Sequence, residues 1–273
     1  MPLRCCVLFC VCTLMLFSCK NPSDEGKKQG PWIKTWGDEF NGTGAPEAKK
    51  WDRPEYNRRN NDSGPDGWWL QEDSYLDGKG NLVLRAKKIN NRNSDKDQFD
   101  YSTGAIRSYG KFQQQFGRFE IRCQLPTQPG WWVAFWLMSE GVGNVNDAGE
   151  DGTEIDIFEG FGWTDAINHA LHWNGYGAEH QSEGHMAPVP GIRNGFHTFA
   201  LEWEKDMYRF YVDDIETWRS AAGGVSKVPA YVKITAELST ESWAVNQYWS
   251  NNPARAVFPD SFLVDYVRVF KKR

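Results

Sequence analysis

Short segments with a hydrophobic side chain at every second position run along most of this chain. In residues 117–123, Phe119, Ile121 and Cys123 alternate with charged residues. A period of two places apolar side chains on one face of a β-strand and polar side chains on the other. The same alternation recurs in residues 81–86, 196–203, 208–212 and 262–270, and no long amphipathic helix is evident. We therefore expect an all-β chain, folded as a β-jelly-roll sandwich.

The N-terminus has the layout of an export signal. Arg4 supplies one positive charge, and residues 5–17 form a mainly apolar run that ends just before Cys19. This run of about a dozen residues is shorter than the roughly 20 needed to span a bilayer as a helix. We expect a signal peptide over residues 1–18, a polar and flexible tether over residues 19–31, and a folded domain over residues 32–273.

The residues around Cys19 resemble the lipobox of bacterial lipoproteins. A leucine stands three positions before the cysteine, and a serine stands immediately before it. The resemblance implies that Cys19 is lipidated and becomes the mature N-terminus. It also implies an exported protein that is anchored to the bacterial outer membrane by this lipid alone and faces the cell surface.

Charge and composition narrow the range of partners. The formal net charge is −5, so a general affinity for nucleic acid or for an anionic membrane is not expected. The chain contains 14 tryptophans, more than a core of this size needs. An exposed indole ring needs a flat apolar partner, such as a sugar ring. We expect a monomer with a polysaccharide as its partner.

Three acids occur within one apolar strand pattern. Glu154, Asp156 and Glu159 alternate with Ile155, Ile157 and Phe158, which are strong strand formers. Glu154 and Asp156 share a face on a regular strand, but Glu159 would point to the opposite face. One extra residue near positions 157–158, a β-bulge, would return Glu159 to that face. We therefore predict a bulged strand that carries three carboxylates on one side.

This arrangement suggests a reaction. The α-carbons of Glu154 and Glu159 would lie about 13 Å apart at about 3.3 Å per residue. Their side chains can lean inward to a carboxyl separation of about 5 Å, the spacing of a retaining glycosidase. Three crowded acids cannot all ionise cheaply, so one is expected to stay protonated as a general acid. A solvated acidic edge and a structural cation site are the alternative interpretations.

Residues 154–159 resemble the catalytic strand of glycoside hydrolase family 16 in its β-bulge form, the form of laminarinases and agarases. Ordered supporting blocks resemble other strands of that family, at residues 36–40, 102–107, 117–122, 132–137 and 264–269. The resemblance implies a concanavalin-like jelly roll with a concave substrate groove, and a catalytic domain over residues 32–273. It implies Glu154 as nucleophile, Glu159 as acid/base and Asp156 as the residue that tunes both. It implies no cofactor for catalysis.

Several residues are candidates for holding the sugar. Trp132 and Trp136 alternate onto one face of the strand before the acids, and the resemblance places Trp136 under the sugar. Core packing is the alternative for Trp132. His172 is expected to contact Glu159 or the leaving sugar, and a structural histidine is the alternative. The remaining candidates are Asn57, Arg107, Trp173 and Trp243.

Two further residues have structural interpretations. Asp265 resembles an acid that contributes to a calcium site in several members of the family, so the resemblance implies a structural calcium at Asp265. Cys123 lies on the apolar face of its strand and is expected to be a buried hydrophobic residue.

The sequence leaves the substrate open. The first hypothesis is endo-hydrolysis of β-1,3- or β-1,3/1,4-glucan. The second is endo-hydrolysis of a β-galactan, namely agar, porphyran, carrageenan or an O-glycan, because residues 174–185 depart from the laminarinase pattern. The third is a non-catalytic carbohydrate-binding lectin, against which the intact acid triplet argues. Transglycosylation by the same intermediate is a further alternative.

Overall fold

The computed structural model describes residues 31–60, 64–92, 99–145, 148–162, 164–238 and 252–273. Contacts divide the chain into two units, Met1–Gly30 and Pro31–Arg273, and the second unit holds all described residues. Regular structure in these ranges is β-strand, with three short 3-10 helices: η1 (Gln71–Asp73), η2 (Glu140–Gly143) and η3 (Pro253–Arg255). Across the same ranges, no helix is long and apolar enough to cross a membrane.

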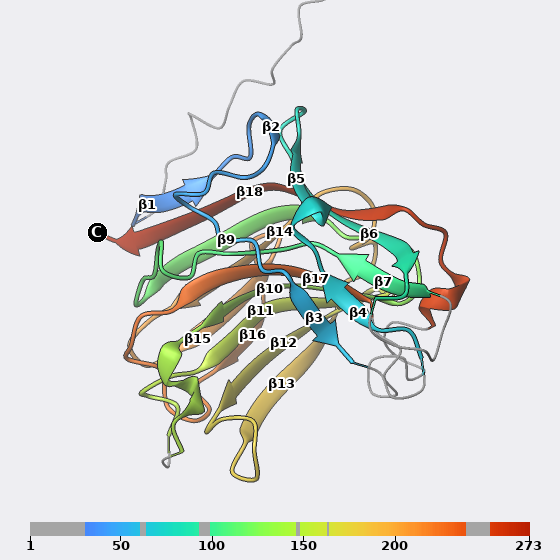
Figure 1. Ribbon diagram of the computed structural model, residues 1–273. Coiled ribbons are helices and arrows are strands. Elements are labelled where there is room, and N and C mark those ends of the chain that lie inside the picture. Colours follow the sequence, from blue (N-terminus) through green and yellow to red (C-terminus); the bar gives the residue numbers. More distant parts are fainter. Residues whose placement is uncertain (1–30, 61–63, 93–98, 146–147, 163, 239–251) are drawn as a thin grey trace, which may run out of the picture. The chain divides into compact units, whose positions relative to one another are not determined.

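The larger of two sheets has twelve strands (Figure 1). Nine of them follow the order β16-β15-β14-β9-β18-β6-β7-β4-β3, while β1 pairs with β18 and β5 joins β2 to β6. Their bounds are β1 Trp32–Asp38, β2 Thr43–Gly44, β3 Tyr56–Arg59, β4 Gly67–Trp69, β5 Ser74–Asp77, β6 Leu82–Asn90, β7 Phe99–Thr103, β9 Gly117–Gln124, β14 His197–Trp203, β15 Tyr208–Val212, β16 Ile215–Ser220 and β18 Asp260–Lys272.

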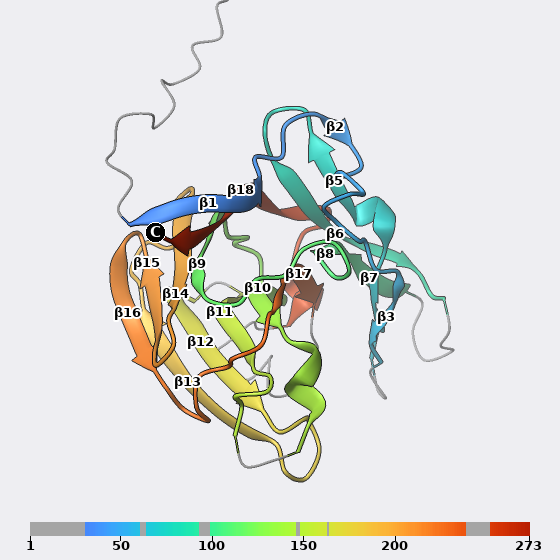
Figure 2. The same ribbon diagram turned by 90° about the vertical axis from the view of Figure 1, so that its left-hand side faces the viewer.

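The smaller sheet has six antiparallel strands in the order β13-β12-β11-β10-β17-β8. Their bounds are β8 Ala105–Arg107, β10 Trp131–Met138, β11 Glu154–Phe161, β12 Ala166–Trp173, β13 Gln181–Pro188 and β17 Tyr231–Leu238. This sheet curves beside the larger one, as Figure 2 shows.

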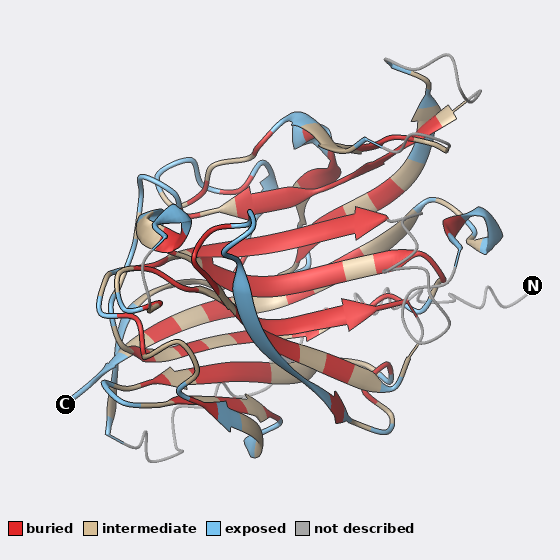
Figure 3. Ribbon diagram, turned by 90° about the horizontal axis from the view of Figure 1, so that it is seen from below, coloured by how far each residue is buried: buried red, intermediate tan, exposed pale blue. Residues whose placement is uncertain are grey.

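One hydrophobic core joins the two sheets. Side chains from both sheets, including Phe119, Phe158 and Phe199, are fully buried in it, and the buried residues run along the strands in Figure 3. The Phe158 and Phe199 rings lie 4.1 Å apart, centroid to centroid, across the interface. The expected all-β sandwich is therefore confirmed, and Cys123 is buried in the same core as predicted.

The hairpin between β15 and β16 follows the sequence closely. Asp213 and Asp214 form its two-residue turn, and both have positive φ angles of 48° and 62°. Two successive positive φ values are typical of a type I′ turn, whose twist matches that of antiparallel strands. Asp213 is also held by His197 and by the backbone N–H of Thr198.

A β-bulge interrupts β11 at Ile157 and Phe158. Asp156 is paired with Ala170 and Glu159 with Asn168, so three steps along β11 match two steps along β12. Ile157 and Phe158 are successive residues, yet both are fully buried in the core. Two adjacent apolar side chains can enter one core only if the strand accommodates an extra residue. The bulge predicted from the sequence is therefore present at the predicted position.

Candidate active site

The outer face of the smaller sheet forms a cleft of about 710 Å³. Directly opposed residues of antiparallel strands point to the same face, so the strand register arranges the cleft side chains in rows. One row runs through Lys233, Trp136 and Asp156, and the next through Thr235, Ala134 and Glu159. Flanking rows carry Glu154 opposite His172, and Glu237 opposite Trp132. These residues all line the cleft.

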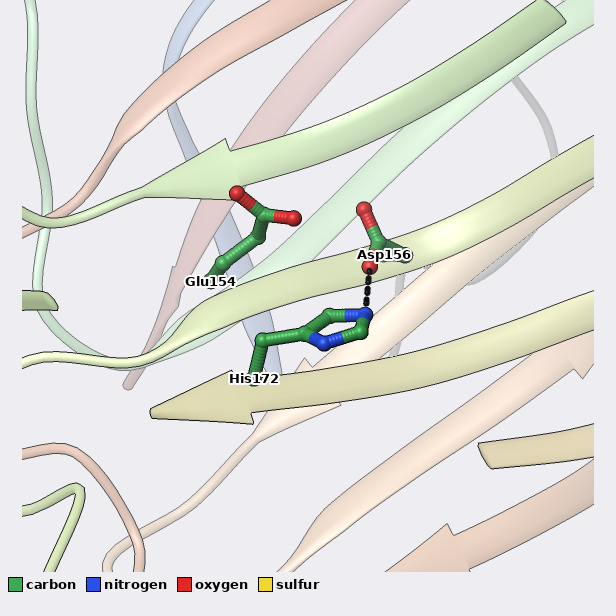
Figure 4. Close-up of side chains that lie close together, drawn as sticks. All are labelled: Glu154, Asp156 and His172. Carbon is green, nitrogen blue, oxygen red and sulfur yellow. Dashed lines mark ion pairs between the residues drawn. The ribbon is translucent and has the colours of Figure 1, made fainter. Parts of the chain in front are cut away.

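The three predicted acids meet in this cleft because of the bulge in β11. Asp156 and Glu159 are 4% and 8% exposed, and Glu154 lies beside them (Figure 4 shows Glu154 and Asp156). Burial is the largest cause that raises the pKa of each carboxyl, and negative neighbours raise all three pKa values further. A cluster of this kind holds protons at a pH where isolated acids are ionised.

Glu159 has the environment of a general acid. Burial raises its pKa to about 7, against opposing hydrogen bonds from Asn168 and Trp132 that stabilise the charged form. Asn168 Nδ2 donates to one carboxylate oxygen at 2.7 Å, and Trp132 Nε1 donates to the other at 2.9 Å. A pKa near neutrality suits a group that must both give and take a proton.

Glu154 has a different set of neighbours. The hydroxyl of Tyr176, from the loop between β12 and β13, donates a hydrogen bond to its Oε2. This bond, together with the positive charges of Lys233 and Arg58, lowers the pKa of Glu154 and so opposes the effect of burial. These three groups favour the ionised carboxylate, which is the form that a nucleophile needs.

His172 lies beside Asp156. Its Nε2 is 3.4 Å from Oδ2 of Asp156, and its Nδ1 is 3.0 Å from Nε2 of His180, whose ring stacks on it (Figure 4 shows His172 and Asp156). The sequence predicts a contact of His172 with Glu159 or with the leaving sugar, and of the two acids Asp156 and Glu159 the structure places Asp156 beside the ring. Their positions explain the difference, because His172 pairs with Glu154 in the register while Glu159 pairs with Asn168. Burial lowers the pKa of His172 to about 4, so its imidazole is neutral at neutral pH.

The same three residues form a potential metal-binding group. Ligand atoms of Glu154, Asp156 and His172 lie within 4.8 Å of one another. Carboxylate and imidazole donors suit several divalent ions. Two of the three are also predicted catalytic carboxylates, so an ion bound here would compete with the substrate for the same groups.

The two predicted tryptophan platforms both line the cleft, and cations lie over them. Lys233 Nζ is 3.6 Å from the ring centroid of Trp136, and Arg59 Cζ is 4.3 Å from that of Trp132. Trp136 Nε1 donates to Thr235 at 3.1 Å. At least part of each indole surface therefore faces a cation of the protein rather than open cleft.

Three other predicted sugar contacts do not line the cleft. Trp173 is only 6% exposed and belongs to the core, because it follows the cleft residue His172 on a strand where successive side chains alternate. Asn57 donates to Asp66 at 3.0 Å instead. Arg107 is opposite Lys233 in the register, but its guanidinium pairs with Asp52 at 2.6 Å.

Two remaining predictions concern metal and lipid. Asp265 pairs with the guanidinium of Arg122 at 2.5 Å, so a cation of the protein already contacts its carboxylate. Among the described residues, Asp265 is not part of a cluster of three or more ligating side chains. Cys19 and Trp243 lie outside the described residues.

Sequence reasoning missed several cleft residues. Tyr176, Arg59, Lys233 and Glu237 all line it but were not singled out in the sequence. Lys233 and Glu237 occupy alternate positions of β17, so their shared face was available as a signal. Tyr176 lies in a loop, where no periodicity indicates the direction of a side chain.

Two glutamates that face one cleft of a two-sheet β-sandwich are typical of a glycoside hydrolase. Residues 65–262 match the family model described as "Glycosyl hydrolases family 16", which covers more than half of the chain. The chain belongs to glycoside hydrolase family 16, with the concanavalin-like sandwich of that family. Glycoside hydrolases of this family need no cofactor for catalysis.

Three comparisons illustrate the range of similar proteins. A beta-glucanase of Rhodothermus marinus is 28% identical, over 91% of this chain and 88% of its own length. A keratan-sulfate endo-1,4-beta-galactosidase of Sphingobacterium multivorum is 29% identical, over 95% of this chain and 65% of its own length. The crystal structure of SCLam, a non-specific endo-beta-1,3(4)-glucanase, has a TM-score of 0.71 and 26% identity, and covers 89% of this chain and 92% of that one.

Proposed function

We propose that this chain hydrolyses an internal β-linkage of a polysaccharide with retention of configuration. Glu159 protonates the glycosidic oxygen while a carboxylate oxygen of Glu154 attacks the anomeric carbon, which breaks the bond to the leaving sugar. Glu159 then takes a proton from water, and the resulting hydroxide displaces Glu154. The observation that carries this proposal is the unequal surroundings of the two glutamates, which suit Glu159 to be the acid and Glu154 the nucleophile.

The stereochemistry of the first product tests this mechanism. Hydrolysis followed by NMR within minutes of mixing is expected to give the β-anomer before mutarotation. Glu154→Gln is expected to lose turnover while still binding substrate. Initial release of the α-anomer, or full turnover by Glu154→Gln, would exclude the mechanism. Binding by the wild-type chain without hydrolysis would favour the lectin alternative.

Two substrate classes remain candidates. Similarity to the beta-glucanase and to SCLam supports β-1,3- or β-1,3/1,4-glucan as the first. Similarity to the keratan-sulfate endo-1,4-beta-galactosidase supports a β-galactan or an O-glycan as the second substrate class. The cations that lie over Trp132 and Trp136 also favour this second class. Reducing-end release on laminarin, barley glucan, agarose, κ-carrageenan and keratan sulfate separates the two. Production of larger oligosaccharides from a pure oligosaccharide would reveal transglycosylation.

We further propose that the chain is exported and held at the outer membrane by a lipid on Cys19, as a monomer. The run of apolar residues before this cysteine carries the proposal. Labelled palmitate is expected to enter the wild-type chain but not Cys19→Ala, and protease treatment of intact cells tests surface exposure. Light scattering of the purified folded domain measures the oligomeric state. A labelled Cys19→Ala variant would contradict the anchoring proposal.

A further inference from the structure

Three cations lie along one side of the cleft. They come from β3 and β17, and each lies over an indole ring. We call Arg58, Arg59 and Lys233 the cationic flank. The ring beneath Arg58 is Trp69 at 5.1 Å, the ring beneath Arg59 is Trp132 at 4.3 Å, and the ring beneath Lys233 is Trp136 at 3.6 Å.

A single buried carboxylate serves both arginines. Glu237 is 4% exposed, and its two oxygens accept from Nε of Arg58 at 3.1 Å and from Nε of Arg59 at 2.6 Å. Both guanidinium groups therefore contact the same carboxylate. The Nη atoms of Arg58 have no hydrogen-bond partner among the described residues, and Arg58 lines the cleft.

Lys233 is the least compensated of the three cations. It is 8% exposed and lines the cleft, yet within the described parts of the chain its Nζ has no hydrogen-bond acceptor and no carboxylate oxygen within 4.0 Å. Indole rings attract an ammonium group, but they do not accept its three hydrogen bonds in full. Buried charges are otherwise nearly always paired, because desolvation is costly.

Substrate binding makes this imbalance worse. Glu154 offsets the charge of Lys233 in part, through space. In the proposed covalent intermediate Glu154 becomes a neutral ester, and the negative charge moves to Glu159, which has given its proton to the leaving sugar. Lys233 thus loses the charge of Glu154, and the bound sugar displaces the water that solvates the cleft. Among the described residues, Glu237 is the carboxylate that bonds to the cationic flank, and it bonds to the two arginines rather than to Lys233. A neutral hydroxyl on the sugar can accept a hydrogen bond, but it cannot balance the charge of Lys233.

We propose that the cationic flank binds an anionic substituent of the substrate, either a sulfate ester or a carboxylate, with Lys233 Nζ and the Nη atoms of Arg58 as donors. This proposal rests on the proposed glycosidase function and narrows its substrate class. It assigns the substrate to acidic glycans rather than to neutral glucans. Charge-assisted hydrogen bonds of this kind are about twice as strong as neutral ones, so they can set specificity.

The test uses matched glycans and the full folded domain. Each backbone is presented in an anionic form and a neutral form, and binding is measured with Glu154→Gln so that nothing is cleaved. Keratan sulfate and its desulfated product form one set, and sialylated and desialylated O-glycans form another. We expect one anionic form to bind at least about tenfold more tightly than its neutral partner, and the two sets distinguish sulfate from carboxylate.

Variants locate the effect. In the Glu154→Gln background, Lys233→Met keeps the length of the side chain but removes its charge, and it is expected to abolish the preference. Lys233→Arg is expected to retain it. Lys227→Met, which changes an exposed lysine paired with Glu150, is the matched control and should keep the preference. Arg58→Gln provides a second variant on the flank should Lys233→Met fail to fold.

Three results would overturn the proposal: equal binding of anionic and neutral forms, no anionic glycan among those bound, or an equal loss for all forms in Lys233→Met. Failure of the proposed function is a separate result, seen as a wild-type chain that binds these glycans without releasing reducing ends. The charge preference of Glu154→Gln is measured in either case.

Discussion

Trp132 donates its indole N–H to Oε1 of Glu159 over 2.9 Å. The sequence suggests a flat platform for sugar at this position, but the ring also acts on Glu159, the proposed acid/base. Its hydrogen bond stabilises the charged form of Glu159 and so lowers the pKa of this carboxyl. Burial acts in the opposite direction and is the larger effect, so the pKa is raised to about 7. Asn168 acts in the same direction on the other carboxylate oxygen, so two side chains hold this pKa near neutrality.

The alkaline limit of activity should follow this pKa. Glu159 must be protonated to act as an acid, so kcat/KM is expected to fall as the pH rises through about 7. Asn168→Leu removes a hydrogen bond to the charged form, which raises the pKa and moves this limit upward by about one pH unit. A pH profile of kcat/KM measures it.

Ser182→Ala is the control for this experiment. Ser182 lines the same cleft but makes no hydrogen bond to Glu159. The alkaline limit of kcat/KM in Ser182→Ala should match that of the wild type. A downward shift in Asn168→Leu would contradict the assignment of Glu159 as the acid.

Tyr176→Phe should affect the other side of the pH profile. The lost hydroxyl donates to Glu154, and this bond lowers the pKa of that carboxyl. Without it the pKa rises, so the nucleophile becomes protonated at a higher pH and the acidic limit moves upward. We expect kcat to fall about tenfold, the effect of losing a hydrogen bond to a charged group.

Tyr109→Phe serves as its control, since Tyr109 is exposed and does not line the cleft. An unchanged acidic limit in Tyr176→Phe, together with an unchanged kcat, would show that the Tyr176 loop has no influence on the nucleophile.

The bulged strand was predictable because its signal is local. Ile157 and Phe158 are two adjacent apolar residues between acids, and only an extra residue lets both enter the core while Glu159 faces the cleft. The flanking strands were predictable for the same reason. Side-chain alternation along each strand is visible in the sequence without knowledge of its neighbours.

The rest of the cleft depends on contacts between distant parts of the chain. Arg58 and Glu237 are 179 positions apart, and nothing local in either segment indicates their pairing. Strand order decides which residues share a row, and it is a property of the whole sheet. Trp173 illustrates a different error. Side chains alternate along β12, so Trp173 cannot face the cleft together with its neighbour His172.

Trp173→Ala should therefore reduce stability rather than substrate binding. The ring packs in the core, and Gly223 lies so close that a Cβ on it would be 2.6 Å from the indole. Removing a buried tryptophan should lower the free energy of unfolding by about 3–5 kcal/mol. Urea unfolding measures this loss, while KM of the folded fraction should stay unchanged. Ile215→Ala, at a side chain that is 70% exposed, should change neither. A raised KM with normal stability would return Trp173 to the cleft.

Chemical rescue should separate the roles of the two glutamates. Glu159→Ala removes the proposed acid/base and is expected to lower kcat by about 10²–10⁴ on a natural substrate. A substrate with a good leaving group still forms the ester on Glu154, and azide then attacks it in place of water. Because two displacements have occurred, the glycosyl azide should retain the starting configuration. Glu154→Ala instead lets azide attack the substrate directly, so a single displacement should invert it. NMR of the two azides assigns each configuration, and an exchange of the two outcomes would reverse the assigned roles.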